Sequence, residues 1–417
     1  MIKVTHLSFS AIGGGAAIAC RRLNEAMQRF GIDSRIVTAN QLSPVPTHAS
    51  RLWRIWFKFY SRRYWKSFRS ASEQHKTLGT WSAGYSLNRL DTNVTIRDGD
   101  IVYLHWINSN MVSIEELGRL LDSGKQVIWF LHDMWPFTGG CHYSLDCLSF
   151  HSHCGACPML SSSNEMDLSF SVFERKLKHL FGRNNLTIVS PSRWLADCAR
   201  RSRLFAKNHI EVIPNIIDPD VFRPIRKRVA REALGLPLDK QLILFGCDAG
   251  SKNFYKGWNF LREAFSIIDS GNLELVMFGS NEQDSLKHEF SQKVHFLGRL
   301  NDELSLRLAY SAANVFVSPS IAENFSQTLC ESSACGTPTV CFDIGGNSDI
   351  VQHKQTGYCA MYKDSEDLAQ GINWILDSAH YDDLAQKARE HIVSLCAPEV
   401  VINQHKRLLR MLALNER

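Results

Sequence analysis

Two glutamates eight residues apart, Glu323 and Glu331, follow the apolar run VFVSPS, which is typical of a buried strand. Asn324 and Gln327 suit a helix capping box, and Gly336 marks the end of the predicted helix. Glu323 would then lie at the mouth of a helix whose exposed backbone amides favour a diphosphate. Glu331, two turns into that helix, could bind the hydroxyls of a ribose through both carboxylate oxygens. Two separate surface charges are the alternative interpretation of this pair.

A scaffold for these residues is indicated by alternating strand and helix patterns. Lys3–Phe9 alternates β-branched and apolar residues and is followed by the glycine turn Gly13–Gly15 and an amphipathic run over Ala16–Phe30. This order of strand, loop and helix recurs along the chain and predicts a parallel sheet covered on both faces. The further strands predicted in the first half are Arg35–Ala39, Ile101–His105, Val127–Leu131 and Leu186–Ser190.

A second set of the same kind follows a proline-punctuated connection that begins at Ile213-Pro214-Asn215. At 417 residues the chain is long enough for two hydrophobic cores. We therefore expect two doubly wound α/β domains, residues 1–214 and 215–397, and a final helix in 398–417 that could pack back on the first domain. A ligand shared by such domains lies in the cleft between them. The strands predicted in the second domain are Leu242–Gly246, Leu273–Gly279, Val294–Leu297, Val315–Ser318 and Thr339–Phe342.

The segment Glu323–Glu331, continued through Ala334–Pro338, resembles the E-x7-E signature of family 4 retaining glycosyltransferases. Gly345–Ile350 and Thr356–Tyr358 resemble the next segment of that family, and Ile213–Phe222 resembles its inter-domain joint. The resemblance covers most of the chain. It implies a GT-B fold, in which two Rossmann-like domains face each other across a cleft, with a nucleotide sugar bound by the second domain and the acceptor against the first.

The resemblance also implies roles for individual residues. A cation after the first strand of the second domain holds the donor diphosphate in this family, and Lys256 is at that place. The family commonly has an arginine a few residues earlier, where this chain has Ser251 and Lys252. A histidine at the position of His132 contacts the donor sugar in similar enzymes. The candidate catalytic residues are therefore His132, Glu323 and Lys256, and the candidate donor-binding residues are Gly14, Gly15, Lys252, Asn324, Phe325, Ser326 and Glu331.

Ordinary structural roles are the alternatives for several of these side chains. His132 ends the strand VIWFL and His105 ends the neighbouring predicted strand, where a doubly wound sheet presents side chains to its ligand. Either could instead be a hydrogen-bonded structural histidine, and Lys256 could be a solvated loop residue. A dinucleotide-binding site is the competing interpretation of the glycine loop, but Ile18 stands where that motif needs a glycine or alanine.

The mechanism implied by the resemblance retains the anomeric configuration, with Lys256 and helix amides stabilising the departing diphosphate. It needs no divalent metal or other cofactor for catalysis. The chain contains two D-x-D strings, one directly before a predicted strand and one in the inter-domain joint. We interpret both as structural; they are Asp98-Gly99-Asp100 and Asp218-Pro219-Asp220.

Four of the twelve cysteines crowd into one stretch with the spacing C-x5-C-x6-C-x2-C. Four thiolates at this spacing can close a tetrahedral zinc site, which would stiffen the loop and leave no open position for catalysis. Free thiols or one disulfide are the alternatives. Together with the preceding His-Asp-x-Trp segment, the cluster resembles the colanic-acid-type branch of the family. The candidate ligands of a structural zinc are Cys141, Cys147, Cys154 and Cys157.

Residues 51–69 contain seven basic and eight aromatic side chains and no acidic one. On a helix the rings would gather on one face and the cations on the other, which is typical of a helix at a membrane surface. Rings packed into the first domain and a nucleic-acid-binding face are the alternatives. The overall balance of 47 basic and 42 acidic residues argues against nucleic acid as a partner. The candidate membrane-binding residues are Arg51, Trp53, Arg54, Trp56, Phe57, Lys58, Arg62, Trp65 and Lys66.

No stretch of the sequence reaches the roughly 18 apolar residues that a spanning helix needs, and its start is too short and polar for a signal peptide. We therefore expect a cytoplasmic protein that is peripheral on the inner face of the membrane. The predicted activity is transfer of a sugar from a nucleotide-sugar donor to a lipid-linked glycan acceptor, in exopolysaccharide or surface-glycan assembly. The alternative is a non-catalytic GT-B-like protein that binds a nucleotide sugar or a lipid head group.

Overall fold

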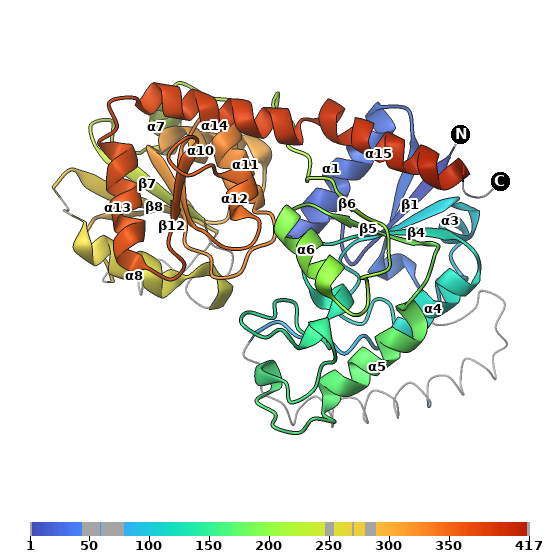
Figure 1. Cartoon of the computed structure of the whole chain (residues 1–417). Coiled ribbons are helices and arrows are strands. Elements are labelled where there is room, and N and C mark those ends of the chain that lie inside the picture. The colour runs from blue at the N-terminus through green and yellow to red at the C-terminus, as the bar shows by residue number, and fades with distance from the viewer. Residues whose placement is uncertain are drawn as a thin grey trace. The chain divides into compact units, whose positions relative to one another are not determined.

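A computed structural model describes residues 2–43, Phe59, 79–246, 254–268, 271–279 and 289–414 (Figure 1). The chain divides into two compact units: the first unit is Met1–Ile213 with His405–Arg417, and the second unit is Pro214–Gln404. The predicted membrane-binding residues of segment 51–69 and the candidate donor-binding residue Lys252 lie outside the described residues.

The first unit is built on a six-stranded sheet in the order β2-β1-β3-β4-β5-β6, and every neighbouring pair is parallel. Parallel strands need a crossover between them, and helices supply most of these crossovers. The strands and helices are β1 (Lys3–Ser8), α1 (Gly15–Arg29), β2 (Asp33–Thr38), α3 (Val94–Asp98), β3 (Ile101–Leu104), α4 (Ile114–Asp122), β4 (Gln126–Phe130), α5 (Leu168–Leu180), β5 (Leu186–Ser190), α6 (Arg193–Arg201) and β6 (Ile210–Val212).

The second unit repeats this plan with a six-stranded parallel sheet in the order β12-β11-β10-β7-β8-β9. A 3-10 turn, η6 (Phe254–Lys256), precedes the first crossover helix of this sheet. The other elements are α7 (Lys227–Leu234), β7 (Gln241–Gly246), α8 (Trp258–Ile267), β8 (Leu273–Phe278), β9 (Val294–Phe296), α10 (Glu303–Ala312), β10 (Val315–Ser318), α11 (Gln327–Ala334), β11 (Thr339–Phe342), α12 (Asn347–Ile350), β12 (Gly357–Ala360), α13 (Ser365–Leu376) and α14 (Tyr381–Cys396).

Both faces of the second sheet are buried. Along β7, Ile243 and Phe245 belong to one hydrophobic cluster, whereas Leu242 and Leu244 belong to another. Side chains alternate between the two faces of a strand, so these clusters are the cores on opposite sides of the sheet. A strand buried on both faces reads as an unbroken apolar run, which explains why this strand could be predicted from the sequence. The predicted doubly wound α/β fold is confirmed.

The last helix, α15 (Pro398–Leu414), begins in the second unit and ends in the first. Within the first unit, His405 Nδ1 lies 3.1 Å from the hydroxyl oxygen of Tyr103 on β3, and the Lys406 ammonium lies over the ring of Phe30. These contacts attach the end of the helix to the first sheet and to the end of α1. No described helix has the length and apolar character needed to cross a membrane.

Each sheet has one point at which the order of its strands reverses. In the first unit this switch point lies between β1 and β3, and in the second unit it lies between β7 and β10. Open α/β sheets bind their ligands beyond the carboxyl ends of the strands at such a point. The residues that follow β1, β3, β7 and β10 are therefore where a functional site is expected.

Candidate functional site

At the switch point of the second sheet, the segment that follows β7 packs closely against the loop that follows β10. The backbone nitrogen of Ile321 donates to the carbonyl oxygen of Tyr255 at 2.9 Å. Gly257 has φ 67°, and a Cβ at this position would lie 1.8 Å from the carbonyl oxygen of Pro319. Only glycine fits this approach, because any side chain would collide with backbone. The sequence thus fixes the two loops against each other.

This contact brings together two of the predicted catalytic side chains. The Nζ atom of Lys256 donates to Oε2 of Glu323 at 3.0 Å, with the side chains 31% and 15% exposed. An ion pair with this much solvent access is worth about 0–1 kcal/mol, so a phosphate could compete for the ammonium at little cost. The pair supplies a positioned cation and a positioned carboxylate at the switch point.

The helix after Glu323 begins later than the sequence predicts. The predicted capping box of Asn324 and Gln327 is wrong: α11 starts at Gln327, and its N-cap is Ser326, whose hydroxyl accepts from the Leu329 nitrogen at 3.4 Å. Serine is a strong N-cap, and it shifts the helix start past Asn324. Glu323 therefore lies four residues before the helix, and Glu331 is its fifth residue, about one turn in rather than two.

Glu331 is buried, and its Oε2 accepts a hydrogen bond of 2.9 Å from the hydroxyl of Tyr310 on α10. The tyrosine thereby fixes the carboxylate inside the unit. Asn324 and Ser326 are also buried, and the ring of Phe325 packs in the core formed with α10 and α11. The ring of Phe325 is therefore part of the core and is not presented to a ligand.

The glycine loop of the first unit leaves open space at the start of α1. Gly14 is the N-cap of this helix with φ 78°, and no side chain caps it. Among the described residues, no atom other than those of the adjoining residues lies within 4 Å of a Cβ placed at Gly13, Gly14 or Gly15. A ligand could approach these backbone groups closely, and a helix N-terminus favours a negatively charged ligand.

His105 and His132 follow the adjacent strands β3 and β4, and the structure brings them together. Nδ1 of His105 lies 2.9 Å from Nε2 of His132. His132 is partly exposed, whereas His105 is buried. Burial lowers the pKa of His132 to about 4, although nearby Asp133 raises it, and burial together with the neighbouring histidines holds the pKa of His105 well below its usual value. Both rings are therefore neutral near pH 7.

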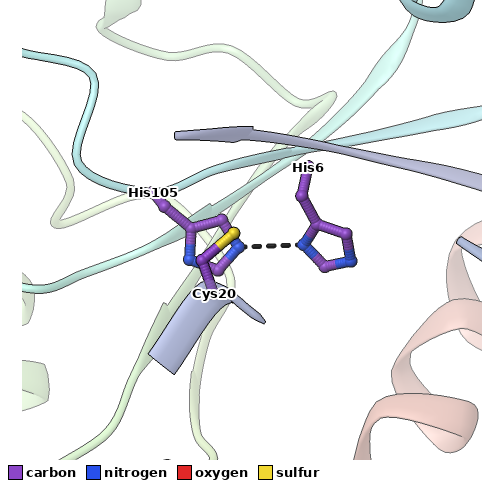
Figure 2. Close-up of side chains that lie close together, drawn as sticks. All are labelled: His6, Cys20 and His105. Carbon is purple, nitrogen blue, oxygen red and sulfur yellow. Dashed lines mark hydrogen bonds between the residues drawn. The ribbon is translucent and has the colours of Figure 1, made fainter. Parts of the chain in front are cut away.

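His6 on β1 completes this cluster and was not predicted from the sequence. Its Nδ1 lies 2.9 Å from Nε2 of His105, and its Nε2 lies 3.0 Å from the hydroxyl oxygen of Ser34 on β2 (Figure 2). The signal that could have revealed it is a histidine within the predicted strand that comes directly before the glycine loop. A lone histidine of this kind is usually a core residue, and only the strand order shows that it faces His105.

Asp133, next to His132, has a structural role. Its Oδ1 accepts from the Trp135 nitrogen at 2.9 Å, and its Oδ2 lies 2.5 Å from Nδ1 of His142 and 3.1 Å from the indole nitrogen of Trp106. Burial alone would raise the pKa of this carboxyl, but His142 and the Trp135 amide lower it below its usual value. The ionised carboxylate organises the loop after β4 and so fixes the position of His132.

The four clustered cysteines lie in loops between β4 and α5. Burial raises the pKa of Cys154 to about 12 and raises the pKa values of Cys141 and Cys157, so these thiols are protonated without a metal. Across the described ranges, one group of His, Cys, Asp or Glu side chains has at least three ligand atoms within 4.8 Å of one another, and it is His6, Cys20 and His105. Zinc at the four cysteines stays a prediction.

Comparison with known proteins identifies the family. The family model of glycosyl transferases group 1 matches residues 227–391, which include the loops after β7 and β10 and the whole of α11. An uncharacterized glycosyltransferase of Methanocaldococcus jannaschii is 30% identical over 320 residues, which cover 72% of this chain and 78% of that protein. The chain belongs to the glycosyl transferases group 1 family.

Other relatives match part of the chain or its fold. A D-inositol 3-phosphate glycosyltransferase of Catenulispora acidiphila is 31% identical over 193 residues, 42% of this chain, and the chain spans only 44% of that protein. Sucrose-phosphate synthase from Thermosynechococcus elongatus has a similar structure, with a TM-score of 0.66, 19% identity and full coverage of both chains. HepE of Anabaena, solved in complex with UDP and glucose, has a TM-score of 0.61 and 14% identity, covering 98% of this chain and 100% of that one. These structures support the GT-B fold.

Proposed function

We propose that the protein transfers a sugar from a nucleotide-sugar donor to a glycan acceptor, with the donor held at the switch point of the second sheet. The observation that carries the proposal is the Lys256–Glu323 pair, 3.0 Å apart, at the carboxyl edge of that sheet within the residues that match the family. The solved HepE complexes with UDP-glucose and with UDP and glucose support a nucleotide-sugar donor.

The ammonium of Lys256 binds the donor diphosphate in this proposal. A diphosphate competes with Glu323 for the lysine, because it carries more negative charge than the carboxylate. The carboxylate of Glu323, released from the lysine, then accepts hydrogen bonds from hydroxyls of the donor sugar. As the bond between the sugar and the diphosphate breaks, charge that develops on the leaving group meets the fixed ammonium and the amides at the start of α11.

Glu331 binds the ribose of the nucleotide in the same proposal. Tyr310 holds its carboxylate at 2.9 Å, and the charge of a buried carboxylate strengthens its hydrogen bonds to hydroxyl donors. In the first unit, His132 binds a hydroxyl of the substrate, a role suggested by the family resemblance and by its partial exposure after β4. Lys256, Glu323 and Glu331 then each recognise a different part of the donor.

Retention of configuration and independence from metal ions are further parts of the proposal. The anomeric configuration of the glycosidic bond in the product, determined by NMR and compared with that of the donor, tests the first. Activity that persists in excess EDTA tests the second. An inverted product, or activity abolished by EDTA and restored by magnesium or manganese, contradicts the corresponding statement.

The acceptor is proposed to be a lipid-linked glycan of the exopolysaccharide type, met at the cytoplasmic face of the membrane. The basic and aromatic composition of residues 51–69 supports this part of the proposal, since each cation near an anionic surface adds about 1 kcal/mol of binding. Flotation with vesicles that contain phosphatidylserine tests it. Binding lost when Arg54, Lys58 and Arg62 become glutamate is expected, and unchanged binding contradicts it.

A thermal-shift screen of the full chain against nucleotide sugars, followed by a transfer assay with each one that binds, tests the activity. A bound donor stabilises the native state by mass action, by about 2.7 kcal/mol at 100 times its Kd. Stabilisation by a nucleotide sugar, together with release of the free nucleoside diphosphate, is the expected result. Stabilisation without any turnover would instead support a non-catalytic binding protein.

A further inference from the structure

Five buried or partly exposed side chains of the first unit form one continuous hydrogen-bond chain. It runs from Asn24 through Ser34, His6 and His105 to His132. The four donor–acceptor distances along it are 2.8, 3.0, 2.9 and 2.9 Å, in that order. The residues come from α1, β2, β1 and the ends of β3 and β4, so the chain crosses the switch point of the first sheet.

The donor and acceptor of every hydrogen bond in this hydrogen-bond chain can be assigned in turn, starting from Asn24. A serine hydroxyl has one proton, and Ser34 gives it to Oδ1 of Asn24. The Nε2 atom of His6 must therefore donate to the oxygen of Ser34. A neutral imidazole has one N–H, so the Nδ1 atom of His6 accepts, and it accepts from the Nε2 proton of His105. By the same reasoning, the Nδ1 atom of His105 accepts from the Nε2 proton of His132.

This assignment of donors and acceptors requires that all three imidazole rings are neutral. Burial keeps them neutral. Burial lowers the pKa of His6 to about 3, and that of His132 to about 4. His105 is stacked on the rings of Phe130 and His132, and burial holds its pKa well below its usual value. Each ring then carries a single N–H proton at neutral pH. Every hydrogen bond in the hydrogen-bond chain is therefore donated in the same direction, from His132 toward Asn24.

We propose that Asn24, Ser34, His6 and His105 are positioning residues that hold His132 in its Nε2–H tautomer, so that its Nδ1 lone pair is presented to a hydroxyl of the substrate. The role at the substrate rests on the proposed function, whereas the tautomer does not. In the other tautomer the Nδ1 atom of His132 would be a donor, and it could no longer accept a hydrogen bond from a hydroxyl. Substrate recognition would thus be controlled by residues that do not touch the substrate.

A metal site is the competing explanation for part of this cluster. Figure 2 shows Cys20 of α1 beside the rings of His6 and His105, and the three ligand atoms lie within 4.8 Å of one another. The two facing nitrogens, however, already share a hydrogen bond of 2.9 Å, and the nitrogen that carries the shared proton has no lone pair for a metal ion. This feature favours the hydrogen-bond chain.

The tautomer can be measured on the full chain labelled with 15N-histidine, because the shifts of the two ring nitrogens distinguish N–H from an unprotonated nitrogen. A His132→Gln variant identifies the signals of His132. We expect a single Nε2–H form at pH 7 in the wild type. Replacement of Ser34 by alanine removes the acceptor of His6 and should give a second tautomer of His132, whereas Ser34→Thr, which keeps the hydroxyl, should not.

The kinetic test uses a matched pair at position 105. His105→Phe keeps the ring stacking but removes the acceptor of His132, and His105→Asn keeps an acceptor oxygen near the place of Nδ1. We expect kcat to fall about tenfold to 100-fold in the first variant, by analogy with the loss of hydrogen-bond partners of metal-ligating histidines, and to recover at least partly in the second. The Ser34 pair gives the same comparison if the phenylalanine variant does not fold.

Three results would overturn the proposal. One is an Nδ1–H or doubly protonated His132 in the wild type at pH 7. Another is an unchanged tautomer in the Ser34→Ala variant. The third is stoichiometric metal in protein purified without chelators that is lost on Cys20→Ser. If no nucleotide sugar is turned over while the Nε2–H tautomer is observed, the proposed function fails and the positioning network stands.

Discussion

The two units share a topology but place different chemistry at their switch points. In the second unit a partly exposed lysine and carboxylate form an ion pair, 3.0 Å apart. In the first unit the same position of the sheet holds neutral imidazoles joined by hydrogen bonds. All buried histidines among the described residues belong to the first unit; they are His6, His105, His142 and His405. The same topology can therefore place a charged pair suited to a phosphate in one unit and neutral imidazoles suited to hydroxyls in the other.

The largest expected effect is a difference between the two units in how their stability depends on pH. The folded-state pKa of His6 and of His405 is about 3, and that of His132 about 4, all below the usual 6.5. Between these values and 6.5 the unfolded chain binds more protons than the folded one, so stability is complete above pH 6.5 and falls as the pH is lowered. Each histidine contributes a slope of about 1.4 kcal/mol per pH unit in this window.

Hydrogen–deuterium exchange at several pH values, corrected for the intrinsic exchange rate, can follow the two units in one sample. The sheet of the first unit should lose protection between pH 6.5 and 4, while the sheet of the second unit, whose described histidines are not buried, should lose much less. Equal loss in both sheets would mean that the buried histidines do not distinguish the units.

The next effect concerns the charge of the second unit. Lys256→Ala should lower kcat about 100-fold to 1,000-fold, in the range seen when one group that stabilises developing charge is removed. Its unfolding midpoint should barely change, because a partly exposed ion pair adds little stability. Lys293→Ala is the control, since this exposed lysine precedes β9 at the amino edge of the same sheet. Equal activity of the two variants would show that Lys256 is not part of the site.

A smaller effect is expected at Glu331. Glu331→Gln keeps an acceptor for Tyr310 but loses the charge, and a hydrogen bond to a charged group contributes about 1.5–3 kcal/mol. We therefore expect the donor Kd to rise about tenfold to 100-fold. Titration with a nucleotide and its 2′-deoxy analogue gives a sharper comparison: the wild type should discriminate between them more strongly than the variant. Identical discrimination would argue against a contact with the ribose.

The smallest effect tests the glycine loop of the first unit. Gly14 and Gly31 have φ values of 78° and 81°, and a Cβ would meet no atom within 4 Å at either. Alanine at either position should cost about 1–3 kcal/mol of stability through backbone strain. Only Gly14→Ala should also weaken substrate binding, because only Gly14 precedes the open end of α1. Equal kinetic effects from both variants would place the ligand elsewhere.

The strands that could be predicted from the sequence are those whose burial is strong. β5, β10 and β11 have the predicted bounds, because each is an apolar run buried on both faces. The predictions missed β6 and β12, which are short edge strands; β6 has three half-buried residues, and β12 begins with a glycine. Glu211 in β6 and Gly357 in β12 are residue types that are depleted in strands, so the sequence signals these two strands less clearly.

The parts of the candidate site that belong to sequence motifs could be predicted. The parts that depend on the order of strands in a sheet could not. The family resemblance predicts a lysine after the first strand of the second domain and a glutamate in the E-x7-E signature, and the structure pairs these two residues, Lys256 and Glu323. The start of α11 was misplaced, because Ser326 and Asn324 are both suitable caps and only backbone geometry decides between them. The hydrogen-bond chain could not have been found, because it joins residues up to 99 positions apart whose contact requires β1 to lie beside β3.

A crystal structure of the protein soaked with its nucleotide-sugar donor tests the central claim most directly. We expect an oxygen of the diphosphate to lie within about 3.2 Å of Lys256 Nζ, beyond the carboxyl ends of β7 and β10. A donor bound away from this edge of the second sheet, with Lys256 still paired to Glu323, would contradict it.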